Sequence, residues 1–168
     1  MNAAHIDQYA DLYVRLSDGT ERLASHDEII NAARRLLDDK IKRVGSISSP
    51  EVAKSFLSLR LGDLQHEVFA VLFLDAQHNV IEYREMFRGT LTQTSVYPRE
   101  IVKKALELNA GAVVFAHNHP SGCEEPSRAD EYLTKTLQSA LKLVDIRVLD
   151  HLIVAGGRVA SFAERGLL

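Results

Sequence analysis

Two histidines and one aspartate in this chain have the residue types and spacing of a catalytic zinc site. His117 and His119 flank a single residue, and Asp130 follows on the same stretch of chain. Two imidazoles and one carboxylate leave the fourth position of a tetrahedral zinc ion open for water, whereas structural zinc sites are normally closed by four protein ligands. Residues two apart on a strand share a face, so two histidines at a strand end can converge on one ion. The spacing therefore indicates a metal-activated water.

Each of these residues also has an ordinary structural explanation. A single histidine at the end of a strand is more often a turn residue or a hydrogen-bonding residue than a metal ligand. Asp130 stands in the first turn of a predicted helix, where a carboxylate complements the helix dipole. The combination favours the metal, because a strand exit, the turn Pro120-Ser121-Gly122 and a helix start would bring all three ligands together.

A hydrolytic site needs a group that accepts and returns a proton, and Glu67 is the best candidate. It begins an otherwise apolar segment, where burying a carboxylate without a partner would be costly. The alternative is that Glu67 simply begins the strand in solvent. Ser127 could donate a hydrogen bond to an oxyanion as charge develops on an attacked carbonyl. Its alternative is the N-cap of a helix, since it follows Pro126 at a predicted helix start, and the two roles are compatible.

Two further polar features bear on the site. Cys123 has no Cys-x-x-Cys neighbour, which argues against the zinc site of nucleobase deaminases, and we interpret it as incidental. Asp150-His151 lies within a predicted strand. It is either a pair that supports a metal ligand from behind or a structural hydrogen bond.

The composition is that of one soluble globular domain, with room for a small appendage. The chain has 168 residues and a net charge of -3, which gives no electrostatic footprint for nucleic acid, so DNA is an alternative partner that the charge does not support. A lone cysteine cannot form an intramolecular disulfide, and no apolar run reaches the length of a membrane span. With no signal peptide at its start, the chain is expected in the cytoplasm. The sequence does not fix the oligomeric state.

Hydrophobic periodicity alternates between strands and helices, which indicates an α/β domain of two or three layers. Helices are predicted over 26–42, over 50–60, from Pro98 onward and over 127–143. Strands are predicted over 68–74, 80–87 and 111–116, with a closing hairpin of 147–155 and 158–162 around Gly156-Gly157. Residues 9–16 could form a short strand or helix. Ser25 and Glu28 have the spacing of a capping box before the first helix.

The best candidate for a domain boundary is the stretch from Gly45 to Pro50, which is rich in glycine, serine and proline. It divides the chain into an N-terminal appendage over 1–46, helical at 26–42, and a domain over 47–168.

The candidate site residues also occur in the order of a known motif. Glu67, the run from His117 to Pro120, Ser127 and Asp130 match the upstream Glu, His-x-His-Pro and Ser-x-x-Asp of the JAMM metalloprotease motif in the JAB/MPN superfamily. Over roughly residues 47–168 the chain resembles the bacterial RadC family, historically called DNA repair proteins. The resemblance extends to segments at 67–69, 72–75, 89–91, 98–101, 116–122, 126–127, 150–151 and 161–162.

This resemblance implies a mixed, curved sheet flanked by helices, related to the cytidine deaminase-like architecture. It implies zinc on His117, His119 and Asp130, with Glu67 as general acid and base. It also implies that Ser127 helps to hold the tetrahedral intermediate. The reaction would be hydrolysis of a peptide or isopeptide amide in a protein or peptide substrate.

The chain departs from related families in two ways. Deubiquitinating members of the superfamily usually carry Ser or Thr between the two histidines, whereas this chain has Asn118, as its RadC relatives do. That difference argues against a ubiquitin-like substrate. Full-length RadC proteins also carry a helical N-terminal region that resembles a helix-hairpin-helix module, so we expect this chain to be a short form.

Two other functions remain as alternatives. One is a DNA repair or DNA-transaction accessory protein in which the metal site is structural or regulatory. The other is a metal-free interaction scaffold, which ranks last because such domains normally lack the ligands that this chain retains.

Overall fold

The computed structural model of the chain describes residues 12–44, 49–89 and 96–168. The predicted linker at 45–50 lies mostly outside this range, and so does the first part of the predicted element at 9–16. The division into an appendage and a domain at residue 47 stays a prediction. Among the helices that the structure describes, none is long and apolar enough to cross a membrane.

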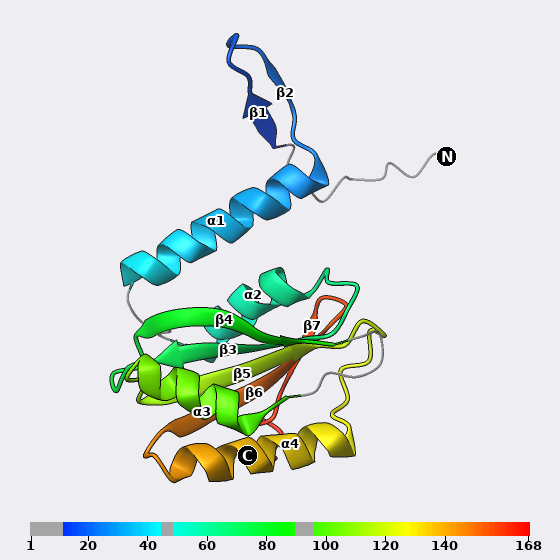
Figure 1. Cartoon of the computed structure of the whole chain (residues 1–168). Coiled ribbons are helices and arrows are strands. Elements are labelled where there is room, and N and C mark those ends of the chain that lie inside the picture. The colour runs from blue at the N-terminus through cyan, green and yellow to red at the C-terminus, as the bar shows by residue number, and fades with distance from the viewer. Residues whose placement is uncertain (1–11, 45–48, 90–95) are drawn as a thin grey trace.

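A five-stranded mixed sheet forms the centre of the molecule (Figure 1). Its spatial order is β4-β3-β5-β6-β7, and only the β5–β6 pair is parallel. The strand bounds are β3 Val68–Leu74, β4 Val80–Arg88, β5 Ala112–Asn118, β6 Arg147–Ala155 and β7 Arg158–Ser161. The prediction of an α/β domain with a mixed sheet is confirmed. β3 and β5 are buried along their whole length, as expected for strands covered on both faces.

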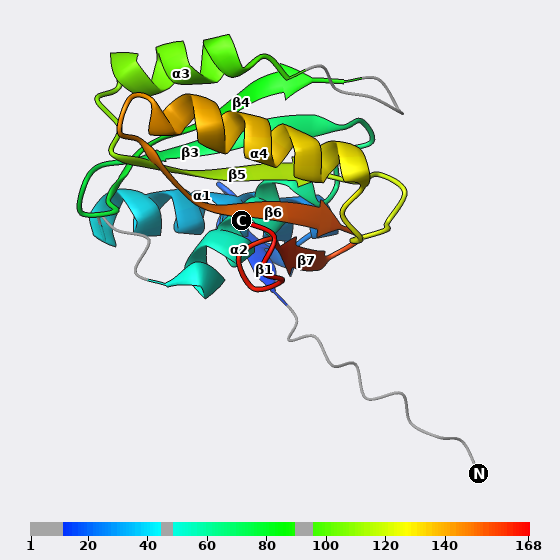
Figure 2. The ribbon, with the colours of Figure 1, turned by 90° about the horizontal axis from the view of Figure 1, so that it is seen from below.

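Helices cover both faces of this sheet and give the domain three layers (Figures 1 and 2). One face packs against α2 (Pro50–Leu61), and the other packs against α3 (Pro98–Glu107) and α4 (Arg128–Lys142). Each interface is an apolar cluster: Phe56, Leu57 and Leu61 of α2 lie with one set of strand side chains, and Ile101, Leu137 and Leu141 lie with the other. The two clusters fix which way every side chain of β5 points.

The N-terminal part consists of a two-stranded hairpin, β1 (Tyr13–Arg15) with β2 (Glu21–Leu23), followed by α1 (His26–Val44). The hairpin projects away from the sheet (Figure 1). The predicted capping box is confirmed, because the Ser25 amide donates to Glu28 Oε2 at 2.9 Å and the Glu28 amide donates to Ser25 Oγ at 3.3 Å. A helix starts where the sequence predicted it.

The predicted helices and strands are all present, with ends that shift by a few residues at most. Pro50 and Pro98 stand in the first turns of α2 and α3, where the missing amide hydrogen has no helical partner to lose. Gly156 and Gly157 join β6 to β7 with φ values of 55° and 82°, a left-handed turn that favours glycine. Local chemistry therefore fixes most of the boundaries.

Asn118, the last residue of β5, holds the segment that leads into β3. Its Oδ1 accepts a hydrogen bond from the buried Val68 amide at 2.8 Å. Its Nδ2 donates to the carbonyls of Leu64 and His66 at 3.2 and 3.0 Å. One amide side chain thus satisfies three backbone groups of the α2–β3 connection, and that connection carries Glu67.

We expect Asn118→Ala to lower the free energy of unfolding by about 1–3 kcal/mol, because it leaves the buried Val68 amide and two carbonyls without these partners. Urea denaturation followed by circular dichroism measures the change. The matched control is Gln65→Ala, an exposed residue of the same connection, which should stay within about 0.5 kcal/mol of the wild type. An unchanged midpoint for Asn118→Ala would contradict the anchoring role.

Candidate metal centre

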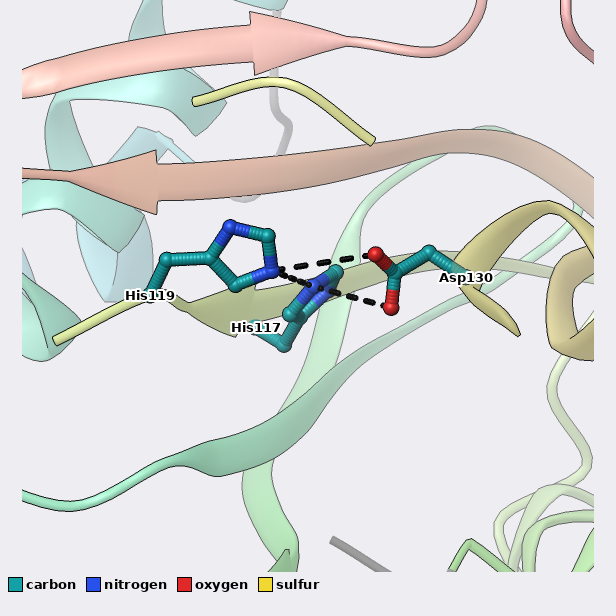
Figure 3. Close-up of side chains that lie close together, drawn as sticks. All are labelled: His117, His119 and Asp130. Carbon is teal, nitrogen blue, oxygen red and sulfur yellow. Dashed lines mark hydrogen bonds and ion pairs between the residues drawn. The ribbon is translucent and has the colours of Figure 1, made fainter. Parts of the chain in front are cut away.

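The ligand atoms of His117, His119 and Asp130 converge at one end of the sheet, all within 4.8 Å of one another (Figure 3). The two Nε2 atoms are 2.9 Å apart. His117 Nε2 lies 3.4 Å from Asp130 Oδ1, and His119 Nε2 lies 3.7 Å from Asp130 Oδ2. The three residues that the sequence singled out as ligands are therefore brought together.

Strand alternation places His117 on the face covered by α3 and α4. Val113 and Phe115 point to that face, and His117 follows them in the same alternation. Its partner across the β3–β5 pair is Phe69, whose ring lies nearly parallel to the imidazole at a centroid distance of 6.3 Å. The imidazole is only 2% exposed. The His117 ring is therefore a polar group among apolar side chains, so its nitrogens need hydrogen-bond partners.

His119 lies just past the end of β5, in a tight turn. Its amide donates to the Val154 carbonyl at 2.9 Å, and its own carbonyl accepts from the Gly122 amide at 3.0 Å. Gly122 has a φ of 77°, which favours glycine at that position. The ring Nδ1 lies 2.6 Å from the Cys123 carbonyl. A carbonyl only accepts, so Nδ1 carries a hydrogen, and Nε2 faces the site.

The loop that provides this carbonyl is tied to the C-terminal part of the chain. Arg158 donates to the Gly122 carbonyl at 2.9 Å and pairs with Glu124 at 3.5 Å. Arg165 pairs with Glu125. Exposed pairs of this kind contribute little individually, but together they fix the turn against β7 and the residues after it.

Asp130 occupies position N3 of α4, and Ser127 is the N-cap. The Ser127 amide and hydroxyl both donate to Asp130 Oδ2, at 2.8 and 2.6 Å, and the Asp130 amide donates back to Ser127 Oγ at 3.2 Å. The N-cap explanation of Ser127 is therefore confirmed. Because the cap uses Oδ2, it orients Oδ1 towards His117.

Behind His117 lies a second buried imidazole, that of His151 in β6. His117 Nδ1 is 2.8 Å from His151 Nε2, and His151 Nδ1 is 2.7 Å from Thr134 Oγ1 on α4. This is the contact that a residue supporting His117 from behind would make. Asp150, however, is not its partner within a pair.

Asp150 serves a structural purpose instead. Its carboxylate accepts hydrogen bonds from the Ser161 hydroxyl at 2.6 Å and from the amides of His151 and Ala163 at 2.7 and 3.0 Å. The bonds from Ser161 and Ala163 join β6 to the last residue of β7 and to the turn that follows it. Successive strand residues point to opposite faces, so Asp150 and the His151 ring lie on different sides of the sheet. The structural alternative holds for Asp150, whereas His151 contacts His117 and Thr134.

Burial controls the charge of both inner imidazoles. Burial lowers the pKa of His117 to about 4; the negative charge of Asp130 opposes this shift, and His119 adds to it. Burial likewise lowers the pKa of His151 well below its ordinary value, with His117 and His119 acting in the same direction. Both rings are therefore neutral at pH 7, which is the form that binds metal ions.

The donor set fits zinc. Each ligand imidazole has its Nδ1 in contact with another group and its Nε2 in the site, and the carboxylate completes a set of two nitrogens and one oxygen. That set is typical of a zinc ion with an open position. Glu67 lies just before β3, partly buried, and is not one of the three grouped ligand residues. Cys123 contributes its carbonyl and not its thiol, and the thiol is free.

Two contributors were missed by the sequence reasoning. Thr134 stands one helical turn after Asp130 and carries no motif of its own; helical spacing from a predicted ligand is the signal that could have found it. The Cys123 carbonyl has no sequence signal, because every residue has one.

The amino-acid sequence of this chain is similar to those of known proteins. The chain matches the family described as the RadC-like JAB domain over residues 47–167. It is similar to UPF0758 proteins of Leptothrix cholodnii and Methylibium petroleiphilum, which are 55% and 56% identical over 150 residues that cover 89% of this chain and 68% of each relative. A UPF0758 protein of Marinobacter nauticus is 54% identical over 150 residues, covering 89% of this chain and 67% of that relative. The chain therefore belongs to the family of RadC-like JAB domain proteins.

Proposed function

We propose that this chain is a zinc-dependent hydrolase of the JAMM type, which cleaves a peptide or isopeptide amide with a water molecule. One observation carries the proposal: two imidazole nitrogens and a carboxylate converge within 4.8 Å at the partly exposed end of a sheet. His119 and Asp130 retain 18% and 15% side-chain exposure. A substrate can therefore approach from their side, whereas His117 lies behind them.

His117, His119 and Asp130 would hold the ion. A zinc ion bound there supplies Lewis acidity and lowers the pKa of a bound water to about 7. The chain's own contribution is to present three ligands from β5, the turn after it and α4, and to leave one side open.

Glu67 is our candidate for the general acid and base. In the β3–β5 pair, Phe69 is opposite His117, and continuing that register puts residue 67 opposite residue 119. Residues 67 and 69 also share a face if the strand alternation continues. From that position a carboxylate would take a proton from the attacking water and deliver it to the leaving amine.

Ser127 is our candidate for stabilising the oxyanion. It is exposed at the start of α4, and its hydroxyl donates to Asp130 Oδ2. In the reaction the hydroxyl would turn to the developing negative charge on the attacked carbonyl. Its amide would keep the bond to Asp130 Oδ2, so the helix cap would persist during that change.

We expect the wild-type protein to bind about one zinc ion per chain, as a single three-ligand site requires. Each of His117→Ala and Asp130→Ala should lose it. Elemental analysis of dialysed protein, with zinc titration by calorimetry, measures the stoichiometry. The matched control is His26→Ala, an exposed histidine at the start of α1, which should bind zinc like the wild type. Wild-type protein that fails to take up zinc would overturn the proposal.

We expect Glu67→Gln to keep its zinc and to lose about 10²–10⁴-fold in turnover, because the amide cannot accept the proton from water. Cleavage of a diverse peptide library, followed by mass spectrometry, measures the rate, and zinc content is measured on the same samples. Glu85→Gln, an exposed glutamate of β4, is the matched control and should cleave like the wild type. If Glu67→Gln cleaves at the wild-type rate, Glu67 has no role in proton transfer.

A further inference from the structure

A chain of buried hydrogen bonds connects the helix that carries Asp130 to the imidazole of His117. It starts at the Asp130 backbone carbonyl, which is 2.6 Å from Thr134 Oγ1. It continues from Thr134 Oγ1 to His151 Nδ1 at 2.7 Å and from His151 Nε2 to His117 Nδ1 at 2.8 Å. Thr134 and His151 are both 0% exposed. Water therefore does not compete for the two bonds that His151 makes.

The direction of each bond follows from the first. The Asp130 carbonyl can only accept, so the single hydroxyl hydrogen of Thr134 points to it. Thr134 Oγ1 then has only lone pairs for His151, and His151 Nδ1 must donate. A neutral imidazole with hydrogen on Nδ1 has a bare Nε2, so His151 Nε2 accepts from His117 Nδ1. His117 is left with a bare Nε2, which faces His119 and Asp130.

We propose that Thr134 and His151 are positioning residues that fix the tautomer and the ring orientation of His117, so that its Nε2 lone pair is presented to the metal ion. This inference rests on the proposed zinc-dependent function for its purpose. The hydrogen-bond directions themselves are a property of the protein with or without zinc.

The surroundings of His151 keep it in one orientation. Its ring stacks on Phe162 at a centroid distance of 4.7 Å and an interplanar angle of 26°. Phe69 and Phe115 contact it edge-on, at 5.5 and 5.8 Å. Aromatic side chains on three sides leave the two ring nitrogens as the polar contacts of His151, one for Thr134 and one for His117. If the ring rotated, its two nitrogens would lose both hydrogen bonds and would face apolar side chains, which is costly.

The same reasoning applies to the Nε2 atom of the second ligand histidine, His119. His119 Nδ1 donates to the Cys123 carbonyl, so in the neutral form of the ring, which is the form that binds metal ions, His119 Nε2 is bare too. Two nitrogen lone pairs and a carboxylate then meet at one point, with 2.9 Å between the nitrogens. Such a meeting is repulsive by itself, and a cation at that point turns it into attraction. We call the hydrogen-bond chain from the Asp130 carbonyl through Thr134 and His151 to His117 the relay. The relay makes His117 Nε2 an acceptor at the place where a cation would bind.

The relay also couples two ligands. The Asp130 carboxylate lies in the site, and the Asp130 backbone carbonyl accepts a hydrogen bond from Thr134, one helical turn further along α4. Thr134 reaches His117 through β6. The helix ligand and the strand ligand are therefore set relative to each other by a path that does not pass through the metal. Partners of this kind typically change metal affinity by about 10–100-fold when they are removed.

Two measurements test the relay. The first is nitrogen-proton NMR of the seven histidine side chains in zinc-free and zinc-loaded wild-type protein, because nitrogen chemical shifts distinguish a bare ring nitrogen from one that carries hydrogen. We expect hydrogen on Nδ1 of both His117 and His151. Hydrogen on Nε2 of His151 would overturn the relay, and this result needs no variant.

The second measurement compares zinc affinity in Thr134→Val and Thr134→Ser. Valine keeps the shape but lacks the hydroxyl, so we expect the zinc dissociation constant to rise by about 10–100-fold and His151 to lose its single tautomer. Serine keeps the hydroxyl and should restore both. Equal zinc affinity and an unchanged His151 tautomer in Thr134→Val would overturn the relay while leaving the proposed function in place. If the wild type binds no zinc, the proposed function fails, and the NMR result alone decides the hydrogen-bond directions.

Discussion

The burial of two imidazoles side by side is the constraint on which the site depends. His117 and His151 are 2% and 0% exposed, and charging either ring there would mean removing an ion from water. They remain in the core only as neutral rings with their nitrogens in hydrogen bonds. The parallel pairing of β5 with β6 and the packing of α4 on the same face meet that requirement, because they place the Thr134 hydroxyl against His151 and His151 against His117. The mixed order of the sheet is thus part of the site.

Adjacent residues at the end of β5 serve the two faces of the sheet. His117 points to the α4 side and lines the candidate metal centre, whereas Asn118 points to the α2 side and binds the Val68 amide and the carbonyls before it. The α2–β3 connection, with Glu67 at its end, is therefore held by the residue between the two histidines. An amide suits this place because it both donates and accepts. Ser or Thr has one hydroxyl and could not satisfy the same three backbone groups in the same way.

Much of this arrangement could be predicted from particular residues. Local geometry follows from residue chemistry at three kinds of position: the capping box of Ser25, the prolines that open α2 and α3, and the glycine pair before β7. The histidine pair is informative because residues two apart at a strand end point to the same side. The relay could not be predicted, because nothing in the sequence around Thr134 indicates that the fold places its hydroxyl next to His151 of β6. The sequence left open whether Asp150 and His151 form a supporting pair or a structural hydrogen bond, and the structural alternative holds for Asp150 because neighbours in a strand point apart. Sequence adjacency predicts contact in a turn but argues against it in a strand.

Asp130 shows how one residue can join the fold to the chemistry. Its Oδ2 completes the N-cap of α4, its Oδ1 faces His117, and its carbonyl accepts the hydrogen bond that starts the Thr134 relay. A carboxylate at N3 is favourable for the helix before any metal is considered, because it satisfies an exposed amide and opposes the positive end of the helix dipole. The ligand is thus held in place by helix formation itself. A shift of the first turn of α4 would disturb the cap, the carboxylate and the relay together, so the candidate metal centre can keep its geometry only while that turn is intact.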